Sequence, residues 1–211
     1  MKNSKTALLL IGFQNDYFSK DGVLNGAFED PQALENVIVK TTELLNAVAD
    51  TEMLIVETPV KFTANYQELD EPVGILKAIK DAGALIKDTY GSATIDRIKE
   101  TTPQIITLPG KRGLNCFSNT TIDSLLKAHN IDHVMIAGAI TSLCIDTAGR
   151  EALDLGYKVS ILSDCILSRT PFEQRYYLEE IMPLYSTVLS SDQVIQSLAV
   201  WMPVSNNKPG V

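Results

Sequence analysis

The sequence predicts an α/β protein, a three-layer α-β-α sandwich built around a mostly parallel sheet of six strands. Short apolar runs alternate along the chain with amphipathic stretches of helical period. The runs are apolar at nearly every position, which is typical of strands buried on both faces of a parallel sheet. The alternation of strand and helix implies right-handed crossover connections, as in Rossmann-like folds.

The six expected strands share this apolar character, and in chain order they are Thr6–Phe13, Glu52–Thr58, Ile105–Leu108, His133–Ala137, Lys158–Ser163 and Ser186–Ser190. The expected helices lie at Pro31–Ala49, Ala93–Glu100, Asn119–His129, Ser142–Leu155, Phe172–Met182 and Ser191–Val200. Pro31 suits a first helical turn, and Gly156 is typical of a helix stop. The segment 59–92 is long and rich in proline and glycine. Connections of this length are usually functional or hold a small helix, which we place at Gly74–Ile79.

The chain has 211 residues, which suits one domain, since α/β domains commonly run to about 200–250 residues. We expect residues 1–202 to form it and the polar residues 203–211 to fray. The 26 acidic and 18 basic residues give a net charge of −8, which argues against nucleic acid as a partner. No apolar run approaches the roughly 18–20 residues that span a membrane. Three cysteines make no disulfide framework and favour a reducing cytoplasm.

In an open parallel sheet, ligands bind at the carboxyl ends of the strands. The residues that follow the strands are therefore candidates for a site: Gly12–Tyr17, Glu57–Phe62, Gly110–Phe117, Gly138–Cys144 and Asp164. The third of these turns offers a cation and the fourth a thiol.

Several kinds of catalytic and cofactor-binding site require residues that this sequence does not place at the expected ligand-binding edge. The two histidines, His129 and His133, lie near the opposite edge of the expected sheet, so a serine or cysteine nucleophile has no histidine base there. The cysteines are not spaced as zinc ligands, and no GxGxxG motif follows the first strand. We therefore expect neither a metal nor a cofactor.

Cys144 lies where the fourth strand turns into a helix. The unpaired N–H groups and the positive dipole end of a helix favour a thiolate there. The backbone N–H groups of Ile140 and Cys144 are candidates for an oxyanion hole, and Lys111 is a second source of positive charge. The alternative is a small buried cysteine without chemistry, which is the expected role of Cys116 and Cys165.

At these positions the chain resembles the isochorismatase-like cysteine hydrolases, which include nicotinamidases, N-carbamoylsarcosine amidases and ureidoacrylate hydrolases. Three blocks carry the resemblance: Ala7–Asp16 with its Gln-Asn-Asp motif, the lysine block Gly110–Thr120, and the nucleophile block Ala137–Cys144. The resemblance extends from Thr6 to about Ser190.

The family works with an Asp-Lys-Cys triad, so the resemblance implies Cys144 as nucleophile and Lys111 as its cationic partner. It implies a cis peptide between Ala139 and Ile140 that turns N–H groups into the oxyanion hole. It also implies a small-molecule substrate, a covalent acyl intermediate and a homo-oligomer, either a dimer or a tetramer.

The chain departs from the family at the triad aspartate, whose position is taken by Gly12. Glu57 and Asp164 are the candidate substitute bases, and Glu57 is favoured because its strand is adjacent and its side chain longer. Nicotinamidases bind a metal through an Asp-x-His pattern that is missing from residues 58–66, and isochorismatases proper keep the carboxylate but not the cysteine.

The expected activity is therefore hydrolysis of a C–N bond in a small amide, carbamoyl or ureide compound, impaired or run by a displaced base. The alternative is a catalytically silent binding protein. Four aromatic residues either line the substrate pocket or simply pack in the core: Phe62, Tyr66, Tyr90 and Phe117.

Overall fold

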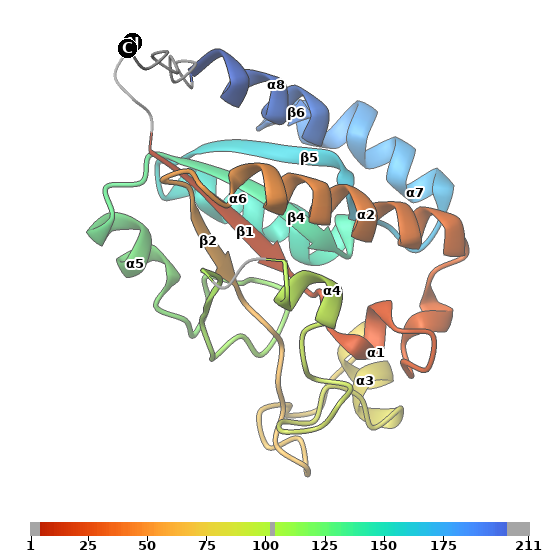
Figure 1. Cartoon of the computed structure of the whole chain (residues 1–211). Coiled ribbons are helices and arrows are strands. Elements are labelled where there is room, and N and C mark those ends of the chain that lie inside the picture. The colour runs from red at the N-terminus through yellow and green to blue at the C-terminus, as the bar shows by residue number, and fades with distance from the viewer. Residues whose placement is uncertain (1–4, 102–103, 202–211) are drawn as a thin grey trace, which may run out of the picture.

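The computed structural model describes residues 5–101 and 104–201, so the tail expected at 203–211 lies outside the described residues. Its centre is a six-stranded sheet with the strand order β3-β2-β1-β4-β5-β6, in which every neighbouring pair is parallel (Figure 1). The strands are β1 (Thr6–Ile11), β2 (Leu54–Glu57), β3 (Ile106–Thr107), β4 (His133–Ala139), β5 (Lys158–Leu167) and β6 (Thr187–Leu189). The expected α/β class and parallel sheet are confirmed.

Helices cover both faces of this sheet. They are α1 (Asn15–Phe18), α2 (Pro31–Val48), α3 (Gly74–Asp81), α4 (Asp96–Lys99), α5 (Ile122–Ala128), α6 (Asp146–Asp154), α7 (Pro171–Tyr176) and α8 (Ser191–Trp201). The longest, α2, begins where the sequence predicts, because the Asp30 carboxylate accepts the N–H groups of Gln32 and Ala33 and Pro31 occupies the first turn.

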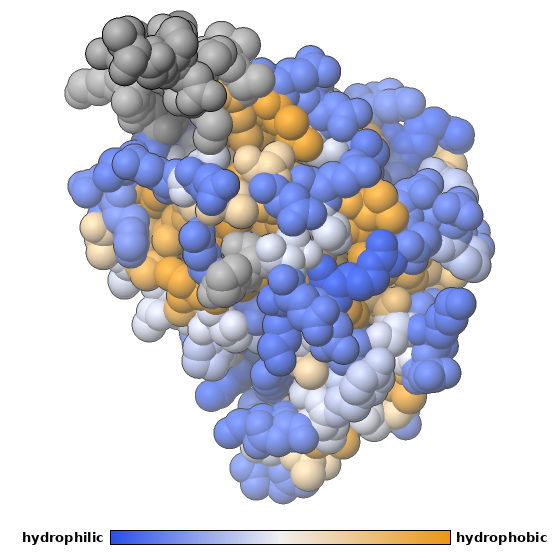
Figure 2. Space-filling model, in the orientation of Figure 1, coloured by the Kyte–Doolittle hydropathy of each residue, from blue (hydrophilic) through white to orange (hydrophobic). Residues whose placement is uncertain are grey.

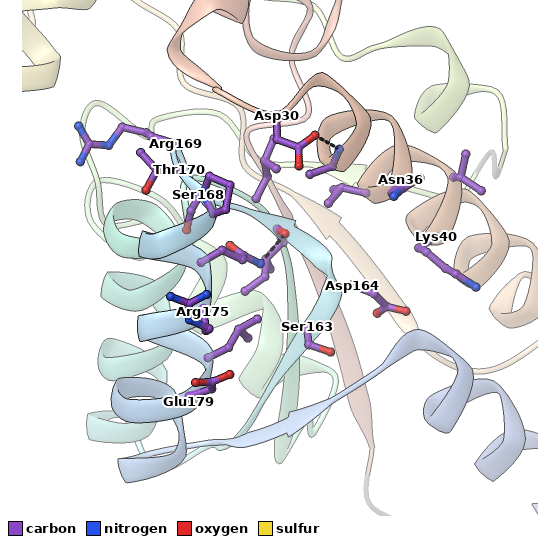
Figure 3. Close-up of a pocket in the computed structure, with 18 residues that line it drawn as sticks. Asp30, Asn36, Lys40, Ser163, Asp164, Ser168, Arg169, Thr170, Arg175 and Glu179 are labelled. Carbon is purple, nitrogen blue, oxygen red and sulfur yellow. Dashed lines mark hydrogen bonds between the residues drawn. The ribbon is translucent and has the colours of Figure 1, made fainter.

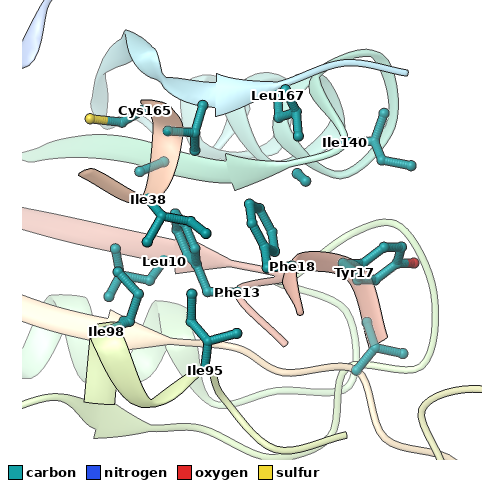
Figure 4. Close-up of a cluster of buried hydrophobic side chains, with 14 of the residues drawn as sticks. Leu10, Phe13, Tyr17, Phe18, Ile38, Ile95, Ile98, Ile140, Cys165 and Leu167 are labelled. Atoms are coloured by element: carbon teal, nitrogen blue, oxygen red, sulfur yellow. The ribbon is translucent and has the colours of Figure 1, made fainter. Parts of the chain in front are cut away.

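The central strand β1 explains the continuous apolar runs. Its side chains alternate between two buried clusters: Leu8 and Leu10 face the cluster that includes α2, while Leu9 and Ile11 face the one that includes α5 and α6. All four are at most 1% exposed. Figure 4 shows part of the first cluster, to which Leu10 and Ile38 of α2 both belong.

The strands β1 and β5 end at other residues than expected, and this affects the site. β1 stops at Ile11 because Gly12 has a φ of +77°, outside the extended region. β5 runs on to Leu167, so Asp164 lies inside the strand and not after it. The polar pair Ser163 and Asp164 suggested a strand end, but both side chains find partners on β6 and α8 and the strand continues.

The Gln-Asn-Asp motif ties the end of β1 to the long segment 59–92. The buried Gln14 amide donates to the carbonyls of Val60 and Ser92 at 2.8 and 2.9 Å, and Asp16 Oδ2 accepts the Leu85 N–H at 2.6 Å. The segment holds the expected small helix, α3. Polar side chains next to β1 thus position α3 over the carboxyl edge of the sheet.

The face in view in Figure 2 is mostly hydrophilic, with apolar residues visible in the gaps between polar ones. Within residues 5–101 and 104–201, no helix is long and apolar enough to cross a membrane.

Candidate active site

The carboxyl edge of the sheet brings Lys111 and Cys144 together. Lys111 follows β3 and is only 1% exposed, and its Nζ donates to Cys144 Sγ at 3.5 Å and to the Gly113 carbonyl at 2.5 Å. Cys144 is half-buried. The structure thus places a buried ammonium against the sulfur of Cys144.

Cys144 lies in a π-helical turn, Thr141–Ile145, that precedes α6, whereas the sequence predicts the first turn of one long α-helix. The turn is anchored to α7, because the Thr141 hydroxyl donates to Gln174 Oε1 at 2.8 Å and the Ser142 hydroxyl donates to Glu173. Single π-turns often occur at functional sites.

The peptide bond between Ala139 and Ile140 is cis, where the family resemblance places it. The Ile140 carbonyl accepts the N–H groups of Leu143 and Ile145. The Ile140 N–H makes no hydrogen bond to any residue that the structure describes. It is thus a free donor beside the half-buried sulfur.

A cavity of about 20 Å³ lies beside the sulfur. A void of this size holds about one water molecule. The side chains around it are those of Tyr17, Val60, Ile75, Leu76, Ile79, Lys111, Leu114, Ile140, Leu143 and Cys144, with Gly113 completing the wall. Among them only a phenol, an ammonium and a thiol are polar. No carboxylate of the described residues lines this cavity.

Gly12 directly follows β1 and lies next to Ala139, the first residue of the cis peptide. A Cβ atom at Gly12 would come within 2.8 Å of the Ala139 carbonyl oxygen, closer than Cβ contacts in real proteins. The backbone at Gly12 is therefore held in a conformation that favours glycine, with a φ of +77°.

Glu57 lies away from the sulfur. Its two carboxylate oxygens accept the hydroxyls of Thr94 and Thr107 at 2.7 and 2.6 Å, and it lines a separate cavity of about 450 Å³ together with Lys61 and Lys99. Glu57 shares its sheet face with Ile55, which packs in the cluster that includes α4. The structure does not bring Glu57 to Cys144.

Asp164 is also engaged elsewhere. Its two oxygens accept the backbone N–H and the hydroxyl of Ser191, at 2.8 and 2.7 Å, so it caps the start of α8. Neither substitute base suggested by the sequence lines the cavity at Cys144.

The four aromatic residues expected to form a pocket wall lie outside that cavity. Phe62 and Phe117 pack in the two hydrophobic clusters, Tyr66 donates its hydroxyl to the Ala84 carbonyl at 2.7 Å, and Tyr90 is 64% exposed. The aromatic residue that does line the cavity is Tyr17 of α1. Its sequence signal was its place directly after the Gln-Asn-Asp motif.

The other two cysteines are fully buried. Burial raises the pKa of Cys116 to about 12, against a smaller opposing effect of the Lys111 charge. Burial, followed by the Asp164 charge, raises the pKa of Cys165 to about 12. Both remain thiols at neutral pH, as their expected packing role requires.

A larger cavity, formed by residues that the structure describes, is distinct from the site at Cys144. It has a volume of about 710 Å³ and lies between α2, the end of β5 and α7, where Lys40, Asp164 and Arg175 are drawn in Figure 3. Neither Lys111 nor Cys144 lines it. In the part of the chain that the structure covers, no group of three His, Cys, Asp or Glu side chains is arranged to hold a metal ion.

The fold and the site together describe an α/β protein that carries a lysine-paired cysteine at the carboxyl edge of a parallel sheet. The isochorismatase domain matches residues 6–193. The chain belongs to the isochorismatase family of hydrolases.

Its relatives agree with this assignment. The chain is 30% identical to ureidoacrylate amidohydrolase RutB of Stutzerimonas stutzeri over 212 residues, which cover 94% of this chain and 85% of that protein. The crystal structure of an isochorismatase-like hydrolase from Alkaliphilus metalliredigens superposes with a TM-score of 0.74 at 24% identity, covering 92% of this chain and 98% of the other. N-carbamoylsarcosine amidase from Thermoplasma acidophilum superposes with a TM-score of 0.68 at 22% identity, covering 89% and 97%.

Proposed function

We propose that the protein hydrolyses a C–N bond of a small amide, carbamoyl or ureide compound through an acyl intermediate on Cys144. The observation that carries the proposal is the 3.5 Å contact between the buried Lys111 ammonium and Cys144 Sγ. The names of two relatives support the reaction class, since one is a ureidoacrylate amidohydrolase and the other an N-carbamoylsarcosine amidase.

In the proposed reaction, the Cys144 thiolate attacks the substrate carbonyl carbon. The developing oxyanion is held by the N–H groups of Ile140 and Cys144, and stabilisation of this kind is worth about 3–4 kcal/mol per donor. The amine departs, and water then hydrolyses the thioester.

The test is ammonia release from a panel of primary amides, N-carbamoyl compounds and ureides. We expect Cys144→Ala to reduce hydrolysis to background and Lys111→Met to reduce it about 100-fold. Lys158→Met is the matched control, because Lys158 is exposed at the start of β5, and its activity should equal that of the parent. Acid quenching during turnover should add the acyl mass to the parent protein and not to Cys144→Ala.

Binding without turnover is the second candidate. It is favoured by Gly12 at the family's aspartate position and by the absence of a carboxylate around the cavity at Cys144. A compound from the panel that raises the melting temperature of the parent without ammonia release or an acyl adduct would favour this candidate over hydrolysis.

The proposal includes one domain over residues 1–202, a reducing cytoplasmic location and a homo-oligomer. Three free cysteines support the location, and the exposed side chains of Phe172, Tyr176 and Leu184 support self-association. Light scattering of the purified protein tests the oligomer, and a monomeric mass at micromolar concentration would contradict it.

A further inference from the structure

The cavity at Cys144 contains three polar side chains, those of Lys111, Cys144 and Tyr17. If the sulfur is the nucleophile, the departing nitrogen still needs a proton, and the family's aspartate is absent. Among the side chains that line the cavity, only the ammonium and the phenol can supply it.

Lys111 is poorly suited to give up a proton. Its ammonium donates to the Gly113 carbonyl and to Cys144 Sγ, so deprotonation would remove the positive charge that faces the sulfur. A neutral Lys111 would no longer stabilise the thiolate when the C–S bond breaks in the second half of the reaction.

Tyr17 is positioned as a donor without a partner. Its side chain is 7% exposed, and its ring packs edge-to-face against Phe28 with centroids 6.3 Å apart. Its hydroxyl makes no hydrogen bond to any of the residues described by the structure. Figure 4 shows this hydroxyl pointing away from Phe13 and Phe18, at the end of the cluster where Ile140 lies.

The charges around Tyr17 change during the proposed reaction. Burial raises the pKa of Tyr17, and the negative charges of Cys144 and then Asp16 raise it further. The side chain is therefore a neutral phenol in the free enzyme. Attack moves the negative charge from the sulfur to the carbonyl oxygen, which the N–H groups of Ile140 and Cys144 hold, so the phenol no longer faces a charged sulfur when the nitrogen departs.

We propose that Tyr17 protonates the leaving nitrogen in the hydrolysis proposed above, on which this inference rests. Attack forms the C–S bond and moves the carbonyl electron pair to oxygen. When that pair returns, the C–N bond breaks, and its electron pair takes the phenol proton as the amine leaves.

The second half of the reaction restores the phenol. Water attacks the thioester carbonyl and gives one proton to the Tyr17 phenolate, while its oxygen forms the new C–O bond. Collapse breaks the C–S bond and returns the thiolate. The sum is amide plus water giving acid plus amine, so no external oxidant or reductant is needed.

The test compares two substrates that share an acetyl group but differ in the leaving group. The nitrophenolate of p-nitrophenyl acetate departs without a proton, whereas the nitrogen of p-nitroacetanilide requires one. We expect Tyr17→Phe to reduce kcat/KM for the anilide about 100-fold and for the ester less than about threefold. A change that merely loosened the site would reduce both rates together.

Tyr157→Phe is the matched control, because it removes a buried phenol that donates to Asp123 Oδ1 at 2.8 Å, away from the cavity. Its two rates should keep the parent's ratio. Equal losses on both substrates in Tyr17→Phe, no loss on either, or a parent that cleaves the ester but not the anilide would each overturn the role of Tyr17. A Cys144→Ala protein as active as the parent on the ester would instead overturn the proposed function.

Discussion

Replacement of Gly12 with alanine tests how tightly the site is built. Two costs follow from the structure. A φ of +77° costs an ordinary residue about 1–2 kcal/mol, and a Cβ at 2.8 Å from the Ala139 carbonyl oxygen forces a backbone shift that costs about 1–3 kcal/mol more. We expect Gly12→Ala to lower the free energy of unfolding by about 2–5 kcal/mol.

Gly83→Ala separates the two costs. Gly83 has a φ of +64°, but no atom lies within 4 Å of a Cβ built there, so only the backbone cost applies. Thermal and urea unfolding of both variants should show Gly12→Ala to be less stable by about 2 kcal/mol, or about 4–8 °C in Tm for a protein of this size. Equal stability of the two variants would refute the close contact with Ala139.

The substitution Gly12→Asp introduces the same Cβ as Gly12→Ala and adds a carboxylate to it. Because the atom that must move is the Ala139 carbonyl oxygen, next to the turn that carries Cys144, we expect the same loss of stability and no gain in hydrolysis. A restored base would be worth about 10²–10⁴-fold, so a gain of that size would show that the missing carboxylate alone limits the enzyme.

Three further predictions follow from the contacts described above. At pH 8, iodoacetamide should label Cys144 in the native protein and leave Cys116 and Cys165 unmodified, because their pKa values near 12 keep them as thiols; labelling that persists in Cys144→Ala would contradict this. Glu57→Gln should leave kcat/KM within about threefold of the parent, and a 100-fold loss would show that Glu57 reaches the substrate after all. Asp30→Ala removes the cap of α2 and should lower stability by about 1 kcal/mol, measured as a fall in Tm of about 2–4 °C, whereas Asp30→Asn should retain most of it.

The sheet was predictable because its apolar runs follow from burial on both faces, as the alternation of Leu8 and Leu9 between two clusters illustrates. The meeting of Lys111 and Cys144 was predictable for a related reason. In a parallel sheet, the residues after successive strands gather at one edge, whatever their separation along the chain.

Other parts of the site depend on information that is not local. Glu57 was favoured for its reach, but the direction of its side chain depends on strand register and on the hydroxyls of Thr94 and Thr107. Phe62 was an equally good candidate for a pocket or a core, because apolar character alone does not distinguish them. Tyr17 lay in the candidate range Gly12–Tyr17 but was not singled out, because α1 has four residues, too few to show a helical period.

The helix α3 supplies Ile75, Leu76 and Ile79 to the wall of the cavity at Cys144, while the thiol and the amine come from turns fixed to the sheet. In the proposed hydrolysis, recognition and reactivity are therefore carried by different pieces of the chain. Changes in three aliphatic side chains on one short helix can alter which compounds are admitted, and the reacting groups stay where the strands hold them.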